Sequence, residues 1–363
     1  MASAGRTGKQ SIRPRLDKDV HCSMTAGTSR RQALVARRLS FSILSLSLLA
    51  SLACSTKVTT GLNADHASKP RARLAFIGDV MLGRGVQAAL AAGGWENGLE
   101  ILVPHLKNAD LALGNLESPL TAASYWRRPE NLADERIYDL RAPPSGILAL
   151  KGSGLDLIML ANNHIMDGGI AGLEDTKVIL NSVGMTTVGP GPQPARVIVN
   201  NLLFTFLALD DVSAPVDLEL VSSLIQEERA EGAFVVVSVH WGGEYIPGPN
   251  PRQRFLAQEL ANAGAALVWG HHPHVLQPIV WSQEDGQPTK TLVAFSLGNA
   301  LFDQVSPPDA RRGAVLLVDF TQDGILQLDA IPFCIDPILG NIIPADYSST
   351  IRIWGRLGIR EQP

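Results

Sequence analysis

The sequence predicts an α/β fold built on a largely parallel or mixed sheet, and two observations support this prediction. Short apolar runs of strand length alternate along the chain with segments of helical pattern. Polar side chains recur at the points where the apolar runs stop, and ligands of open α/β sheets bind at that edge. The 363 residues, 45% of them hydrophobic and 18% charged, provide enough chain for one large domain or two medium ones.

The expected strands are apolar runs bounded by turn residues, and they cover 74–79, 110–115, 155–160, 185–188, 197–199, 202–209, 234–239, 267–269, 291–297 and 314–319. The expected helices cover 85–92, 146–152, 170–183, 218–231 and 251–263. The last helix has the clearest limits, because Pro251 opens it and Gly264 follows it.

The N-terminal segment has the pattern of an export signal. A basic stretch at 30–38 precedes an uncharged apolar run at 39–53, and small residues stand before Cys54. The tripeptide ending at Cys54 resembles the bacterial lipobox, in which the cysteine is acylated and becomes the new N-terminus. A plain cleaved signal or an uncleaved anchor is the alternative reading, and Met24 is a second candidate for the true start.

These patterns divide the chain into four parts. Residues 1–54 form the signal peptide with its lipobox, and residues 55–72 form a flexible tether, because this polar stretch cannot bury a core face. The folded domain is expected at 73–340, and 341–363 is left as a C-terminal tail.

Charge and cysteine content exclude several classes of protein. The formal net charge is −4, from 31 basic and 35 acidic residues, whereas a nucleic-acid binder usually carries a basic stripe. Cys22, Cys54 and Cys334 are far apart in the sequence, so neither a zinc ribbon nor a disulfide framework is indicated.

Five expected strand ends carry Asp, Asn, Glu or His, and these residues are Asp79, Asn115 with Glu117, Asn163 with His164, His240, and His272 with His274. Carboxylate, amide and imidazole groups together suit a divalent transition metal such as manganese, iron or zinc. Loops at successive strand ends provide the convergence that a site for one or two ions needs.

Each element also has a structural reading. An Asp at a strand end is often a helix cap, Asn163 and its neighbour could form a turn, and a lone histidine such as His240 is often a hydrogen-bonded core residue. The segment 271–274, His-His-Pro-His, favours metal binding more strongly. It places three imidazoles within four positions, and Pro273 restrains the backbone between two of them.

The order of these motifs resembles the calcineurin-like metallophosphoesterases and, more closely, the poly-γ-glutamate capsule-synthesis family called CapA. The matching stretches are GDVMLGRGV at 78–86, GNLESPLT at 114–121, ANNHIMDGG at 161–169, HWGGEY at 240–245, GHHPHVLQP at 270–278 and FSLGNALFD at 295–303. The resemblance implies a four-layer α/β/β/α sandwich of the metallo-dependent phosphatase type.

The resemblance also implies the ligands of a first metal. Asp79 and His274 would bind this ion, and Asn115 or Glu117 occupies the place of the acid that bridges two ions. The sequence departs from the phosphoesterase pattern here, because Met81 stands where the family motif Asp-x-His has its histidine, and Asn-Leu-Glu replaces the bridging Asp. The site therefore has one imidazole fewer and a displaced carboxylate.

The second metal would be bound by Asn163, His240 and His272, with His164 as the candidate general acid. Other residues of the matched motifs are candidates to line the cleft, and these are Arg84, His271, Glu244, Tyr245 and Asn299.

These features lead to one expected function and two alternatives. The first is an extracytoplasmic lipoprotein of the CapA type, a metal-dependent hydrolase or accessory factor in synthesis or export of poly-γ-glutamate or a related polymer. The alternatives are a generic extracytoplasmic metallophosphoesterase and a non-catalytic polymer-binding module. The expected partners are an anionic polymer or phosphoester substrate, the membrane through the lipid anchor, and membrane proteins of capsule synthesis, with no nucleic acid.

Overall fold

The computed structural model describes residues 71–124, 139–282, 290–337 and 340–359. The chain divides into two units, Met1–Leu62 and Asn63–Pro363, and every described residue belongs to the second unit. The predicted export signal with Cys54 lies outside the described residues, as does nearly all of the predicted tether. The first described strand begins at Arg71, slightly before the expected domain start at 73.

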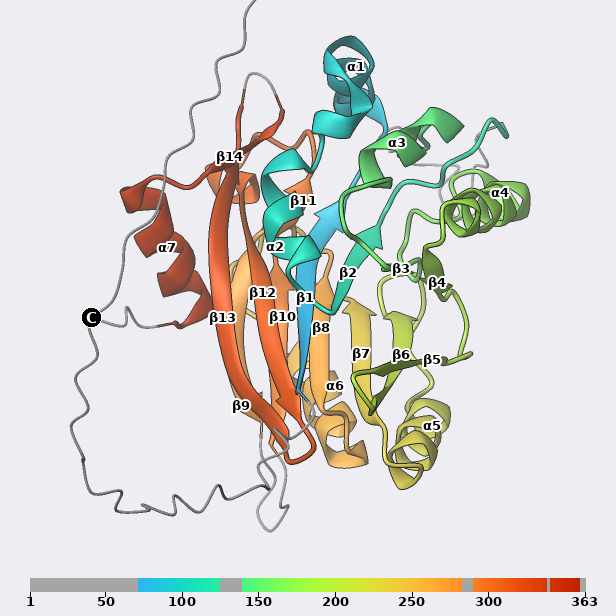
Figure 1. Cartoon of the computed structure of the whole chain (residues 1–363), viewed down its shortest axis with the longest axis vertical. Helices are drawn as coiled ribbons and strands as arrows, with labels where there is room; N and C mark the ends of the chain where they lie inside the picture. Colours follow the sequence, from blue (N-terminus) through green and yellow to red (C-terminus); the bar gives the residue numbers. More distant parts are fainter. Residues whose placement is uncertain (1–70, 125–138, 283–289, 338–339, 360–363) are drawn as a thin grey trace, which may run out of the picture. The chain divides into compact units, whose positions relative to one another are not determined.

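Two sheets form the centre of this unit (Figure 1). The first sheet has the order β14 (Ile342–Pro344), β13 (Gly324–Ile335), β12 (Arg312–Thr321), β1 (Arg71–Val80), β2 (Leu111–Leu116), β3 (Leu157–Met159) and β4 (Thr186–Val188), with β11 (Asn299–Leu301) paired to β1. The second has the order β5 (Ala195–Val199), β6 (Leu202–Asp210), β7 (Phe234–His240), β8 (Leu267–His271), β10 (Thr291–Leu297) and β9 (Leu276–Ser282). In each sheet, four neighbouring strands run parallel, from β1 to β4 and from β6 through β7 and β8 to β10.

Helices cover the outer face of each sheet. The first sheet carries α1 (Arg84–Gly93), α2 (Val103–Lys107), α3 (Ile147–Leu150) and α4 (Gly169–Ser182), and the second carries α5 (Leu218–Ala230) and α6 (Pro251–Ala263). The expected limits of α6 are confirmed, since Asn250 caps its first turn, Pro251 opens it and Gly264 ends it in the left-handed region.

One apolar core lies beneath the helices of each sheet, and a third lies between the two sheets. Phe76 of β1 meets the ring of Trp269 of β8 edge-on at 5.2 Å between centroids. Phe204 of β6 meets Phe320 of β12 in the same way at 5.1 Å. These aromatic residues are fully buried and fix the spacing of the sheets. The predicted four-layer α/β/β/α sandwich is therefore confirmed.

The segment after residue 340 is part of the same packed unit. It forms β14 and the helix α7 (Tyr347–Leu357), which packs against β13 and β9. Ile353 and Leu357 of α7 are completely buried in the core between the sheets. The description of 341–363 as a tail was wrong for these residues, because their apolar stripe is short and stands among serines and arginines. The sequence analysis did not predict β9 either, because only the first two residues of this edge strand are buried.

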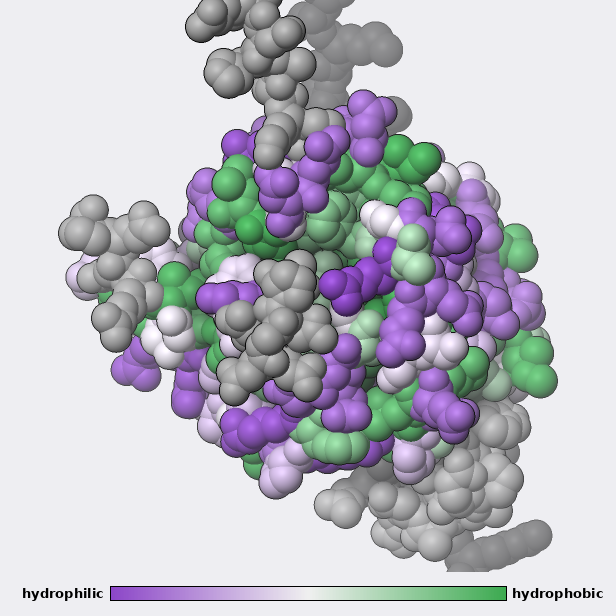
Figure 2. Space-filling model, turned by 90° about the horizontal axis from the view of Figure 1, so that it is seen from below, coloured by the Kyte–Doolittle hydropathy of each residue, from purple (hydrophilic) through white to green (hydrophobic). Residues whose placement is uncertain are grey.

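Hydrophilic residues cover much of the surface at the end where α5 and α6 lie, with hydrophobic residues in smaller groups between them (Figure 2). In the part of the chain that the structure describes, no helix combines the length and the apolar character that a bilayer crossing requires.

Candidate functional site

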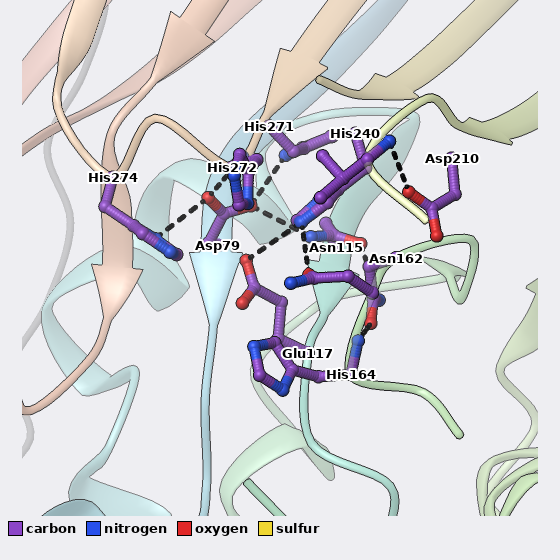
Figure 3. Close-up of polar contacts among 12 residues, drawn as sticks. Asp79, Asn115, Glu117, Asn162, His164, Asp210, His240, His271, His272 and His274 are labelled. Atoms are coloured by element: carbon purple, nitrogen blue, oxygen red, sulfur yellow. Dashed lines mark hydrogen bonds and ion pairs between the residues drawn. The ribbon is translucent and has the colours of Figure 1, made fainter. Parts of the chain in front are cut away.

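The carboxyl ends of parallel strands from both sheets converge on one cluster of polar side chains. β1 delivers Asp79, which lies in register with Asn115 of β2 and Asn299 of β11. In the second sheet, His240 of β7 lies in register with His271 of β8. Figure 3 shows the side chains of this cluster pointing toward one another from the two sheets. The sequence analysis expected this convergence, and the structure brings together its seven predicted metal ligands together with His271 and Asn299.

Small residues allow the strands to approach closely at this edge. A Cβ atom on Gly78 would lie 1.8 Å from the carbonyl oxygen of Gly298, and one on Gly270 would lie 2.1 Å from that of Phe295. Gly298 has a φ of 70° and accepts the backbone N–H of Asp79 at 3.1 Å. Gly78, Gly270 and Gly298 are therefore needed for the close approach of neighbouring backbones at this edge.

Asp79 is the centre of the cluster. Its side chain is fully buried, and Oδ1 contacts Asn115 Nδ2 and His271 Nδ1, each at 2.9 Å. Oδ2 accepts the backbone N–H of His272 at 3.1 Å and lies 3.4 Å from His274 Nδ1. Burial raises the pKa of Asp79, but the hydrogen bonds and charges of His271 and His274 outweigh burial and hold the pKa well below its usual range. Asp79 is therefore an ionised carboxylate.

The two candidates for the bridging position differ in their contacts. Asn115 donates from Nδ2 to Asp79, and its Oδ1 accepts from Asn162 Nδ2 at 3.2 Å. Glu117 is fully buried, and neither of its carboxylate oxygens has a hydrogen-bond partner among the described residues. Burial and then the charge of Asp79 raise the pKa of Glu117 well above its usual range. A cation is therefore the natural partner for the Glu117 carboxylate.

The imidazoles of the second sheet line the other side of the cluster. His240 is completely buried, with Nε2 2.9 Å from Asn163 Oδ1 and 4.0 Å from Glu117 Oε1. Its ring lies 4.9 Å from that of His272. Nδ1 of His240 and Nδ1 of His272 are buried, and neither has a partner in the described part of the chain. Burial lowers the pKa of both rings, that of His272 to about 3, so both are neutral and able to bind a metal.

The His-Pro-His step has an unusual backbone. His272 and His274 have φ values of 89° and 55°, in the left-handed region that side chains other than glycine rarely adopt. Tyr245, with a φ of 61°, donates its backbone N–H to the carbonyl of Pro273 between them at 2.8 Å. Such conformations cluster at functional sites because the surrounding structure must hold them in place.

His274 differs electrostatically from His240 and His272. Its Nδ1 lies 2.9 Å from Asn299 Oδ1 as well as 3.4 Å from Asp79. Burial lowers its pKa, but the charge of Glu117 and the contact with Asp79 outweigh burial and raise the pKa to about 9. The group of Asp79, Glu117 and His274 therefore retains a proton at neutral pH that a bound cation would replace.

Among the residues that the structure describes, two triads of side chains have ligand atoms close enough to share an ion. Asp79, Glu117 and His274 form a fully buried triad, and the atoms concerned lie within 4.8 Å of one another. Glu244, His272 and His274 form a second triad by the same distance, with Glu244 exposed. Glu244 was predicted only as a cleft residue.

Comparison with models of known protein families shows which family the chain belongs to. The family model described as "Bacterial capsule synthesis protein PGA_cap" matches residues 73–203 and 199–304. The chain belongs to this family. It is 32% identical over 249 residues to the PGA biosynthesis protein CapA of Bacillus subtilis, and this match covers 63% of each protein. The chain thus spans less than two thirds of that relative.

Two further similarities concern another capsule protein and a solved structure. The chain is 29% identical over 291 residues to the capsule biosynthesis protein CapA of Bacillus anthracis, across 74% of this chain and 68% of the relative. A crystal structure of a hypothetical protein from Thermus thermophilus matches with a TM-score of 0.45 and 19% identity, covering 72% of this chain and 98% of that one.

His164 lies at the margin of the cluster in this PGA_cap chain. Its Nδ1 contacts Asp167 Oδ2 at 3.1 Å, and its backbone N–H donates to Asn162 Oδ1 at 3.1 Å. The sequence analysis assigned no role to Asn162 or Asp167. Both stand in the ANNHIMDGG motif, and that motif was the available signal. Asn162 hydrogen-bonds both Asn115 and the backbone N–H of His164. It therefore links His164, at the margin of the cluster, to the amide that contacts the Asp79 carboxylate.

The other cleft candidates lie around His274. Asn299 fixes the His274 ring from β11 and donates from Nδ2 to the carbonyl of Ala310 at 3.0 Å. The ring of Tyr245 lies 6.2 Å from that of His274. Arg84 is paired with Asp303, and its guanidinium lies 5.7 Å from the centre of the Phe302 ring, which in turn contacts His274 at 4.8 Å. Arg84 is therefore linked to the cluster by the ring of Phe302, which packs against both Arg84 and His274.

Proposed function

We propose that this PGA_cap protein uses a divalent metal site at the strand ends to act on a polyanionic capsule polymer such as poly-γ-glutamate during its synthesis or export. The observation that carries the proposal is Glu117, a fully buried carboxylate with no hydrogen-bond partner among the described residues, beside Asp79 and His274. An isolated buried carboxylate is strongly unfavourable, and a cation removes this penalty.

The donor set fits such an ion. Asp79, Glu117 and His274 would hold a first cation through two carboxylates and one imidazole. His272 would contribute to a neighbouring position together with Glu244, and the free Nδ1 atoms of His240 and His272 support this arrangement. Asn115 would hold the Asp79 ligand in position, because its amide nitrogen donates a hydrogen bond to Asp79. A divalent transition metal, manganese, iron or zinc, suits these donors, as one or two ions.

A bound cation would supply Lewis-acid polarisation of a phosphoryl or carbonyl oxygen. The residues of the chain would provide the remaining chemistry. Asp167 holds Nδ1 of His164, so the imidazolium form of His164 would donate its Nε2 proton to a leaving group and become the neutral imidazole. Asn162 holds the backbone of His164 in position. The surrounding core excludes water from Asp79 and Glu117 and so strengthens their interaction with the ion.

One feature of the cluster favours a second candidate function, a polymer-binding module without turnover. Met81 stands at the position where the phosphoesterase motif has a histidine, and its sulfur accepts the backbone N–H of Gly83 at 3.0 Å. Asn115 likewise contributes no charge at the bridging position. A site with these two changes would hold a polymer carboxylate through one cation and leave its bonds intact.

The place of action that we propose is the outer face of the cell membrane. The support is the resemblance of Leu52-Ala53-Cys54 to a lipobox and the names of the capsule-biosynthesis relatives. An acylated Cys54 would tether the domain near the membrane proteins that make or export the polymer.

The test is an assay of the full chain, purified without chelators or affinity-column metal. We expect about one divalent transition metal per chain by elemental analysis, as the one fully buried triad among the described residues suggests. The protein is then incubated with Mn²⁺ and either poly-γ-glutamate or a model phosphodiester, with the Glu117→Gln variant as the control. Shortening of poly-γ-glutamate by the native protein alone supports the hydrolase. Binding without shortening supports the polymer-binding module, and a protein that takes up no Mn²⁺, Fe²⁺ or Zn²⁺ contradicts both.

A further inference from the structure

Three of the seven residues that line a cavity outside the metal cluster are arginines. The cavity has a volume of about 250 Å³ and lies between α7, the start of β9 and the start of β12. Arg312, Arg352 and Arg356 line it together with a single acid, Asp309. An adjoining cavity of about 210 Å³, which shares Arg312, adds Arg311 and a second acid, Asp346. This arginine pocket, defined by these four arginines, has no role in the function described above.

The arginine pocket lies at the same sheet edge as Asp79. β12 runs antiparallel to β1 with Leu316 opposite Phe76, so Arg312 at the start of β12 is level with the end of β1. A Cβ atom on Gly298 would lie 2.4 Å from the carbonyl oxygen of Arg312, and Gly298 also accepts the N–H of Asp79. The pocket and the metal cluster are therefore built on shared backbone.

The other wall connects the arginine pocket to His274. Leu276 lines the pocket and lies two residues after His274 in the sequence. Asn299, which holds the His274 ring, donates to the carbonyl of Ala310 in the short 3₁₀ helix Pro308–Arg311. The chain thus joins this wall of the pocket directly to the residues that hold His274.

Guanidinium groups outnumber their acidic partners in the pocket. Asp309 is shared between Arg312 and Arg356, the latter at 2.9 Å. Among the residues that the structure describes, Arg352 makes no hydrogen bond or ion pair, and the buried Nε atoms of Arg311 and Arg312 have no partner. Arginine presents its donors in a planar fork that matches a carboxylate, so the pocket offers unused carboxylate-binding capacity.

Gly355 leaves this space open. It lies inside α7, where a Cβ atom would meet no other atom within 4 Å, so packing does not demand a glycine. Glycine inside a helix is less favourable than alanine. Arg352 and Arg356 lie one turn apart on either side of it in the sequence, while Ile353 and Leu357 face the core. The helix thus exposes two arginines over an unfilled cavity.

We propose that the arginine pocket is a subsite for the free carboxylates of a polyanionic chain whose neighbouring segment occupies the metal cluster. This inference rests on the proposed function and names the part of the surface that recognises the substrate class. Successive carboxylates of a polymer such as poly-γ-glutamate would pair with Arg352 and its neighbours, and the pairing would position the chain across the sheet edge.

The test measures binding of a fluorescently labelled poly-γ-glutamate oligomer to the full chain by anisotropy. Arg352→Gln removes a charge, and Gly355→Phe fills the cavity without a predicted clash at Cβ. Each is expected to weaken binding about tenfold, as loss of a hydrogen bond to a charged group does. The control is Arg254→Gln, an exposed arginine of α6, which should leave affinity within about twofold. Thermal unfolding confirms that each variant is folded.

Three results would overturn the subsite. Unchanged affinity in both Arg352→Gln and Gly355→Phe excludes the pocket. An equal loss in Arg254→Gln indicates general charge attraction, and equally tight, Arg352-dependent binding of inorganic polyphosphate indicates an anion site that does not select carboxylates. The Glu117→Gln background separates this inference from the proposed function. There the Arg352→Gln effect on binding should persist even though metal uptake and any turnover are lost.

Discussion

The side-chain amide of Asn115 donates a hydrogen bond to Asp79 Oδ1 at 2.9 Å, at the position where the resembled phosphoesterases have a bridging carboxylate. A neutral donor at this point stabilises the Asp79 carboxylate and contributes no negative charge of its own. The negative charge of this position is therefore displaced to Glu117, which follows two residues later and is completely buried.

Changing Asn115 to aspartate should restore the bridging charge. Asn115→Asp places two carboxylates side by side, so the metal-free protein should lose about 1–3 kcal/mol of unfolding free energy. With Mn²⁺ present, the variant should bind more metal per chain than the native protein. Elemental analysis and thermal unfolding with and without Mn²⁺ measure both effects. Asn181→Asp, at an exposed position of α4, is the control, and equal metal content in all three proteins would contradict the prediction.

Replacement of Glu117 by glutamine should separate stability from metal binding. The folded pKa of Glu117 lies above its ordinary value of 4.5, so the folded protein binds an extra proton. The free energy of unfolding of the metal-free protein then falls as the pH rises from about 4.5 through the folded pKa. Glu117→Gln should abolish this fall and gain about 1–3 kcal/mol at pH 8, with loss of metal uptake. Denaturant titrations in chelator at pH 5 and pH 8 provide the measurement, and a destabilised variant at pH 8 would refute it.

The protonation of His274 gives a second pH dependence. Its folded pKa of about 9 lies above the ordinary 6.5, so its contribution to stability is complete below pH 6.5 and is lost as the pH rises through 9. His274→Gln should therefore flatten the stability profile between pH 6.5 and pH 9, a range over which loss of the His274 proton costs the native metal-free protein roughly 3 kcal/mol. The change is measured by unfolding in chelator at several pH values. A profile identical to that of the native protein would show that His274 does not hold the proton.

Substitution of two histidines should distinguish a metal ligand from a proton donor. His164→Ala should keep metal content near the native value and lose most activity, since general acid catalysis contributes about 10²–10⁴-fold. His274→Ala should lose metal first, and excess Mn²⁺ should restore part of the activity. Metal stoichiometry and function are measured on the same preparations. His105→Ala on α2 lies outside every motif and should be silent; the opposite pattern, metal loss in His164→Ala alone, reverses the assignment.

The lipid anchor is tested in cells. Cys54→Ser removes the thiol that a diacylglyceryl group would modify, so the variant should fail to incorporate a labelled fatty acid and should not cofractionate with membranes after processing. The matched control is Cys334→Ser, which changes a half-buried thiol within the folded domain. Normal lipid labelling of the Cys54→Ser protein would disprove the lipobox.

Local sequence determined the repeated units of the fold. The limits of α6 follow from Asn250, Pro251 and Gly264, since capping and backbone preference act over a few residues. The apolar runs gave most of the parallel strands, and the motifs placed Asp79 and His240 at strand ends, because a buried strand needs consecutive apolar side chains and its end does not. The resemblance supplied the four-layer arrangement.

Tertiary structure alone decided what each polar residue contacts. Asn115 and Glu117 stand two positions apart, yet they differ in their partners. Asn115 hydrogen-bonds Asp79 and Asn162, whereas Glu117 has no hydrogen-bond partner among the described residues and lies 4.0 Å from His240. The position of the α7 arginines also depends on tertiary structure. Because Ile353 and Leu357 pack into the core between the sheets, Arg352 and Arg356 line the cavity beside α7. Sequence pattern fixes short-range geometry, whereas contacts between distant segments depend on how the two sheets pack, and no local signal encodes that packing.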